Sequence, residues 1–304
     1  MQNSPTFAFA PAKIAIPNGV REAMLQQNHQ KALLLVEGLY HLKVAPEGWF
    51  TFQQIYNLLA NNFGMSERLV REGLRDAQVF QRRKSQPQPG QRGAPPHLHR
   101  VPTLLELIAT FAPQAENTPS DSLIKSDLKN VTAYKMALYH LSIARNWCEN
   151  GGKGVTTYRA FQADRLNISI RTLRTYDKLL GHTVEANYKE TQITGYDLHK
   201  LPRYKDKYGS DGKRLPSRRW LRVVEQREGL KIVTNYPLVH YLAWDALRQE
   251  KQVYVVERLA NTYYPFTLPD VAGLGQVDGY FAKRSAARAA GFQERGDAWK
   301  YQRA

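Results

Sequence analysis

The chain contains a single cysteine, Cys148, among its 304 residues. One thiol cannot form an internal disulfide or a multi-cysteine zinc site, which is typical of a reducing compartment. No run of about 18 uninterrupted apolar residues is present, so the sequence lacks a candidate membrane span. Acidic residues are also scarce, with 27 Asp and Glu against 43 Lys and Arg and a formal charge of +16. We therefore expect a cytoplasmic protein without a membrane partner that binds a polyanion.

The positive charge is concentrated in two blocks. Residues 68–100 carry eight Lys and Arg against two Asp and Glu, and residues 151–222 carry sixteen against seven. Their net charges of +6 and +9 account for nearly all of the +16. A charged surface of this kind also suits RNA or an acidic membrane. Charge alone therefore does not identify the partner, and the local sequence patterns are needed to do so.

The first block follows a predicted helix-turn-helix. Apolar residues at three- and four-residue spacing predict a helix over 31–43, and Thr51 is a plausible N-cap for a second helix. A turn at 63–65 contains Gly64, and Ser66 then caps a third helix. A helix, a glycine-containing turn and a second capped helix are typical of this motif.

The third predicted helix and the segment after it carry the candidate DNA-binding residues of the first block. Arginines three and four residues apart form one outward stripe on a helix, which suits insertion into a major groove. A basic hairpin after that helix would form a wing, with one strand near 79–84 and the other near 97–102. The candidates are Ser66, Arg68, Arg71, Arg75, Arg82, Arg83, Lys84 and Arg92.

Residues 30–112 resemble the winged helix-turn-helix superfamily. The resemblance rests on Ser66-Glu67-Arg68-Leu69-Val70-Arg71, on Phe80-Gln81-Arg82-Arg83, and on Arg92-Gly93-Ala94-Pro95-Pro96 before a strand. It implies a domain that binds duplex DNA with its third helix in the major groove.

Residues 127–222 repeat the same order after a linker at 113–126. An apolar helix ends near Trp147, a second helix follows at 156–165, Ser169 caps a helix over 170–180, and a strand is expected at 183–194. The candidate DNA-binding residues of this second unit are Ser169, Arg171, Thr172, Arg174, Thr175, Lys178, Lys205, Lys207, Lys213, Arg214, Arg218 and Arg219.

Aromatic residues are interleaved with the basic segment that ends at Arg222. Such a mixture suits contacts with phosphates and exposed bases, although we favour a core position for Trp220 beside Leu221 and Val223. Beyond it we expect a strand at 230–233 and a helix over 238–259 that buries Trp244 and Leu247. A short basic helix is expected at 286–291.

Catalytic signals are weak. His97-Leu98-His99 matches a three-residue metal-binding pattern of rolling-circle nucleases, which also require a tyrosine nucleophile. Tyr134, Tyr139 and Tyr176 are candidates by position only. Residues 151–154 are glycine-rich but lack the spacing of a phosphate-binding loop. We interpret the histidines as structural, and we expect neither a metal, nor a cofactor, nor an enzyme.

Together these patterns predict a mainly α fold with small β wings. The expected parts are an arm at 1–29, winged domains at 30–112 and 127–222, the linker at 113–126, and an α/β or helical extension at 223–304. The extension is the candidate surface for self-association or a protein partner. We predict a sequence-specific duplex-DNA-binding protein, nucleoid-associated, acting as a transcriptional regulator or a mobile-element targeting factor. The alternatives are a plasmid or phage replication initiator and, less favoured, a metal-dependent nicking enzyme.

Overall fold

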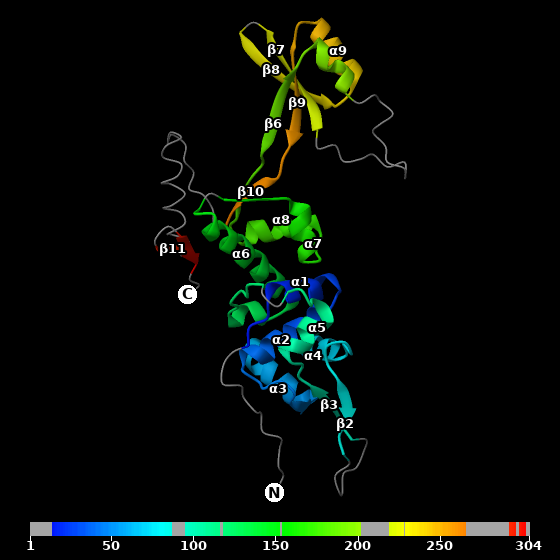
Figure 1. The fold of residues 1–304 in the computed structure, drawn as a ribbon, viewed down its shortest axis with the longest axis vertical. Coiled ribbons are helices and arrows are strands. Elements are labelled where there is room, and N and C mark those ends of the chain that lie inside the picture. The colour runs from blue at the N-terminus through cyan, green and yellow to red at the C-terminus, as the bar shows by residue number, and fades with distance from the viewer. Residues whose placement is uncertain are drawn as a thin grey trace. The chain divides into compact units, whose positions relative to one another are not determined.

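The computed structural model describes most of the chain in two compact units (Figure 1). The described residues are 14–86, 95–115, 118–152, 154–201, 219–227, 229–265, 292–295 and 298–301. Unit 1 comprises residues 1–155, 159–183 and 264–304, and unit 2 comprises 156–158 and 184–263. The helices are α1 (Asn18–Gln26), α2 (Gln30–His41), α3 (Phe52–Phe63), α4 (Glu67–Leu74), α5 (Leu104–Phe111), η1 (Lys125–Leu128), α6 (Val131–Glu149), α7 (Arg159–Arg165), α8 (Ile170–Leu179), η2 (Gly195–Lys200) and α9 (His240–Arg248). The strands are β1 (Trp49–Thr51), β2 (Arg82–Lys84), β3 (His97–Arg100), β4 (Val155–Thr157), β5 (Thr183–Glu185), β6 (Tyr188–Ile193), β7 (Arg219–Arg227), β8 (Leu230–Pro237), β9 (Gln252–Arg258), β10 (Asn261–Tyr264), β11 (Phe292–Arg295) and β12 (Ala298–Tyr301).

The prediction of a mainly α fold is wrong. The fold is mixed α/β: among the described residues about 47% are helical and 23% lie in strands, and these strands form antiparallel sheets of three and four strands. Several of these strands are three residues long and pair with partners far away in sequence. Such strands leave almost no local periodic signal, whereas helices do.

The first helix-turn-helix forms at the predicted helices. Thr51 caps α3 through a capping box with Gln54, and Ser66 caps α4 by accepting a hydrogen bond from the Leu69 amide at 3.3 Å. Gly64 ends α3 in the left-handed conformation, with φ of 68°, which a glycine adopts without the steric cost of a side chain. These cap predictions are therefore confirmed.

A three-stranded antiparallel sheet flanks this motif, in the order β1-β3-β2. Strands β2 and β3 are the two sides of the predicted basic hairpin, and β1, which the sequence did not reveal, pairs with β3. Phe50 pairs with His99, and His99 pairs with Arg82 on its other side. The hairpin is thus anchored to the residues that lead into α3.

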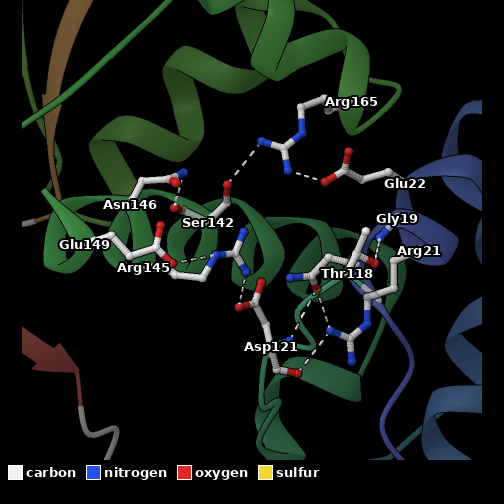
Figure 2. A network of polar contacts seen from close by, with 11 residues as sticks. Gly19, Arg21, Glu22, Thr118, Asp121, Ser142, Arg145, Asn146, Glu149 and Arg165 are labelled. Carbon is white, nitrogen blue, oxygen red and sulfur yellow. Dashed lines mark hydrogen bonds and ion pairs between the residues drawn. The ribbon is translucent and has the colours of Figure 1, made fainter. Parts of the chain in front are cut away.

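The segment predicted to be a linker, 113–126, lies inside unit 1 and is held by polar contacts on both sides (Figure 2). Arg21 of α1 donates to the carbonyl of Asp121 at 3.0 Å, and Arg145 of α6 pairs with the Asp121 carboxylate at 2.6 Å. Thr118 accepts from the Gly19 amide at 3.1 Å. These contacts join α1 to α6 through the segment that contains Asp121.

Helices α6, α7 and α8 form a second helical motif within unit 1. Ser169 caps α8 by accepting from the Thr172 amide at 3.0 Å, which confirms the predicted cap. The buried carboxylate of Asp177 on α8 accepts a hydrogen bond from Tyr139 of α6 at 2.6 Å and pairs with Arg159 of α7 at 3.5 Å. One carboxylate thus connects all three helices.

The chain order of the first motif recurs in the second. Strand β4 lies between α6 and α7, β5 follows α8, and β10 completes a three-stranded sheet in the order β4-β10-β5. This order matches β1-β3-β2, with the last strand in the centre. The difference is the connection between the second and third strands, which here contains β6, η2, β7, β8, α9 and β9.

Unit 2 contains that connection as a four-stranded antiparallel sheet in the order β6-β9-β7-β8. Its core contains Leu221, Val223 and Val253 from the strands together with Ala243 and Ala246 of α9. The predicted helix over 238–259 is wrong beyond Arg248, because the chain turns at Glu250, with φ of 56°, and continues as β9. Trp244 was expected to be buried, but it is 43% exposed.

Two further expectations from the sequence concern a membrane-spanning helix and a short helix near the C-terminus. No helix among the described residues is long and apolar enough to cross a membrane. The short basic helix expected at 286–291 lies outside the described residues.

Candidate nucleic-acid interface

The outer face of α4 carries the predicted arginine stripe in the first motif. Arg68 donates to Glu72 at 2.9 Å, and Arg71 pairs with Glu67 one turn before it. Both arginine side chains remain exposed, at 87% and 53%. Exposed pairs of this type are worth little, so these guanidinium groups can exchange their partners for phosphates at small cost.

A groove of about 580 Å³ separates α4 from the β2–β3 hairpin. It is lined by Thr51, Phe52, Gln53, Arg71, Leu74, Arg75, Arg82, Pro96, His97 and His99. Arginine side chains therefore enter it from both walls, two from α4 and one from the hairpin, and no carboxylate lines it. A groove of this composition attracts an anion.

The charged side chains of the groove are all positive, and this determines its electrostatics. Neither Arg75 nor Arg82 makes an ion pair with a described residue, and both are exposed. Burial of His99, together with the nearby positive charges of Arg82 and His97, lowers the pKa of His99 to about 4. His99 is therefore neutral near pH 7, whereas the three arginines of the groove are charged.

Two aromatic rings that the sequence did not single out, Trp49 and Phe52, contact predicted arginines. Arg83 lies over the Trp49 ring at 4.0 Å, and Arg71 lies over the Phe52 ring at 4.9 Å. These contacts fix the arginines in place by cation–π attraction. The sequence signal for these two rings was the run Trp49-Phe50-Thr51-Phe52, which places aromatic residues on both sides of the predicted N-cap.

Helix α8 carries the second arginine stripe. Arg171, Arg174 and Lys178 are exposed, and none of them makes an ion pair with a described residue. Thr172 and Thr175 lie between them, and Thr175 donates to the Arg171 carbonyl at 3.3 Å. The basic side chains of α8 are thus available to a polyanion without breaking internal pairs.

Two of the remaining predicted residues lie on described strands. Lys84 is exposed on β2. Arg219 lies on β7 of unit 2 and pairs with Glu257 at 3.0 Å. Arg92, Lys205, Lys207, Lys213, Arg214 and Arg218 lie outside the described residues.

The residues weighed for a nicking site are not assembled into one. His99 is buried on β3, and no group of three or more His, Cys, Asp or Glu side chains with metal-binding geometry occurs among the described residues. The tyrosines are buried: Tyr134 donates to Glu37 and Tyr139 to Asp177, while burial raises the pKa of Tyr176. A buried phenol with a raised pKa is a poor nucleophile.

No protein-family model, curated protein or solved structure matches this chain.

Proposed function

We propose that this chain is a non-enzymatic protein that binds duplex DNA through α4 and the β2–β3 hairpin, with α8 as a second contact. The observation that carries the proposal is the groove between α4 and the hairpin, which Arg71, Arg75 and Arg82 line without any carboxylate.

The shape of the first motif supports the same function. A capped helix that follows a helix and a turn can lie in the major groove, while a hairpin beside it contacts the adjacent backbone. This is the arrangement that the resemblance to winged helix-turn-helix proteins implies. The exposed arginines of α4 would read guanine edges or contact phosphates.

The repeated chain order supports α8 as the second contact. Ser169 positions the helix start as Ser66 does in α4, and Arg171 and Arg174 occupy the positions two and five residues after the cap, as Arg68 and Arg71 do in α4. Within this proposal the chain acts as a transcriptional regulator or a targeting factor of a mobile element.

The test begins with selection of a preferred site from a random duplex library by the full chain. Dissociation constants are then measured by fluorescence anisotropy at several salt concentrations. We expect Arg75→Ala and Arg82→Ala each to weaken binding by about 1–3 kcal/mol where they read a base, or to reduce the salt slope by about 1 where they contact a phosphate.

Lys129→Ala is the matched control, because Lys129 is exposed in unit 1 and lies outside the groove. Arg171→Ala and Arg174→Ala test α8 in the same assay. Wild-type affinity and salt slope in both groove variants would contradict the assignment of the groove to DNA.

A further inference from the structure

Among the described residues, the helices α9 and η2 pack against only one face of the four-stranded sheet of unit 2. Side chains alternate between faces along a strand, so Leu221 and Val223 on the core face place Trp220 and Arg222 on the other. Both α9 and η2 contribute to the core face, through Ala243 and Leu198. Trp220 is therefore partly buried on the opposite face and does not lie, as the sequence predicts, in the core beside Leu221 and Val223.

Three aromatic side chains lie on the face opposite α9 and η2, where Val256 between them is fully buried. Trp220 of β7 is opposite Val256 of β9, and Arg222 is opposite Tyr254, two residues before Val256 on the same strand. Tyr188 of β6 meets Trp220 edge-on, with ring centroids 5.6 Å apart. The three rings thus come from three adjacent strands, and Tyr188 is 47% exposed.

Polar contacts hold the central ring in position. The Trp220 indole donates to Asn235 Oδ1 at 3.2 Å, and Arg222 donates to the same oxygen at 3.5 Å. Arg222 also pairs with Glu190. A ring fixed in this way loses little conformational entropy when a flat ligand stacks on it.

The charges on this face suit an anionic ligand. Register places Arg258 opposite Tyr188 and Lys231 opposite Gln226, at opposite ends of the face. Neither cation makes an ion pair with a described residue, and the one acidic side chain of the face, Glu190, is paired with Arg222. A chain of phosphates crossing the aromatic rings would meet positive charge at both ends.

We propose that this face binds single-stranded DNA, with bases stacked on Trp220, Tyr254 and Tyr188 and phosphates near Arg258 and Lys231. Aromatic rings on an open sheet require bases that are free to stack, which a duplex keeps inside its helix. The choice of DNA over RNA rests on the duplex DNA binding proposed above. The site itself uses none of the residues of that interface.

The test measures binding of the full chain to the fluorescent oligonucleotides dT20 and rU20 at low salt. Each of Trp220→Leu and Tyr254→Leu should weaken dT20 binding by about 5- to 150-fold, the range that loss of one stacked base gives. Trp244→Leu is the matched control, since Trp244 is a partly exposed tryptophan of the same unit, on α9. It should bind dT20 as the wild type does.

Tyr188→Leu covers the case in which Trp220→Leu does not fold, because Tyr188 is more exposed; circular dichroism verifies each variant. Arg75→Ala should weaken duplex binding but leave dT20 binding unchanged, so failure of either proposal is visible separately. Absence of dT20 binding, tighter binding of rU20, or equal losses in Trp220→Leu and Trp244→Leu would overturn the assignment.

Discussion

At the scale of single residues, His99 shows how the hairpin's position sets the protonation of one side chain. It is 7% exposed, lies between Phe50 and Arg82 in the sheet, and its Nδ1 has no hydrogen-bond partner among the described residues. Protonation would place a buried charge beside Arg82, and the pKa of His99 is lowered to about 4 for these reasons. The histidine therefore acts as a neutral packing residue behind the groove.

This predicts a pH dependence of stability. The unfolded chain takes up a proton at His99 near the ordinary pKa of 6.5, whereas the folded protein does so only near 4. Between these values the unfolded state binds more protons, so the free energy of unfolding should fall as pH drops from about 7 to about 4 and then level off.

Urea unfolding of wild type and His99→Gln across this pH range measures the effect. The variant should lose the part of the slope that His99 contributes, and His97→Gln is the matched control on the same strand. Equal slopes in wild type and His99→Gln would contradict the prediction.

At the scale of elements, Gly73 allows α4 to pack closely on α2. A Cβ added at Gly73 would lie 2.5 Å from Leu35 Cδ1 and 3.1 Å from the Lys31 carbonyl oxygen. Real Cβ atoms essentially never come within 3.0 Å of another atom, so a larger residue must displace the buried Leu35 side chain or separate the two helices. The position of the arginine stripe relative to the hairpin therefore depends on a residue that bears no side chain.

We expect Gly73→Ala to lower the free energy of unfolding by about 1–3 kcal/mol, although alanine favours helix over glycine, because overpacking exceeds the propensity gain. Thermal and urea unfolding measure this change. Gly195→Ala is the control, since its added Cβ meets nothing within 4 Å. A Gly73→Ala variant as stable as wild type would show that Leu35 or the two helices shift at no cost, and would contradict the prediction.

At the scale of the whole molecule, most of unit 2 is an insertion between two neighbouring strands. The Leu259 amide donates to the Asn187 carbonyl at 2.9 Å, and the Asn187 side chain donates to the Ala260 carbonyl at 2.8 Å. The chain thus leaves β5 and returns to β10 at one point. In the first motif the corresponding connection, between β2 and β3, is the loop of the wing hairpin, so the two motifs differ in the length of this connection.

Replacing residues 188–258 by a two-glycine turn should therefore leave a folded protein. We expect the shortened chain to unfold cooperatively, to retain most of its duplex affinity, and to lose dT20 binding. Calorimetry and the two anisotropy assays measure these outcomes. Loss of the cooperative transition would show that unit 1 needs unit 2 in order to fold.

The sequence by itself determined the local features of both helix-turn-helix motifs. The caps at Ser66 and Ser169, the outward arginines and the basic hairpin could be predicted because each signal lies within a few residues of the backbone it shapes. The same patterns did not reveal β1 or β4, because a strand of three residues is defined by a distant partner.

Only the tertiary structure decided which surfaces these elements form. Residues 113–126 read as a linker by composition, yet Asp121 joins α1 to α6 through partners 24 and 100 residues away. The sequence places Trp220 beside the core residue Leu221. In the structure α9 packs on the face of the sheet that bears Leu221, so Trp220 lies on the opposite face. The pairing of strands and the burial of a sheet face by a helix both depend on contacts between distant segments of the chain. No local pattern of side chains encodes which of the two faces of a sheet another element will bury.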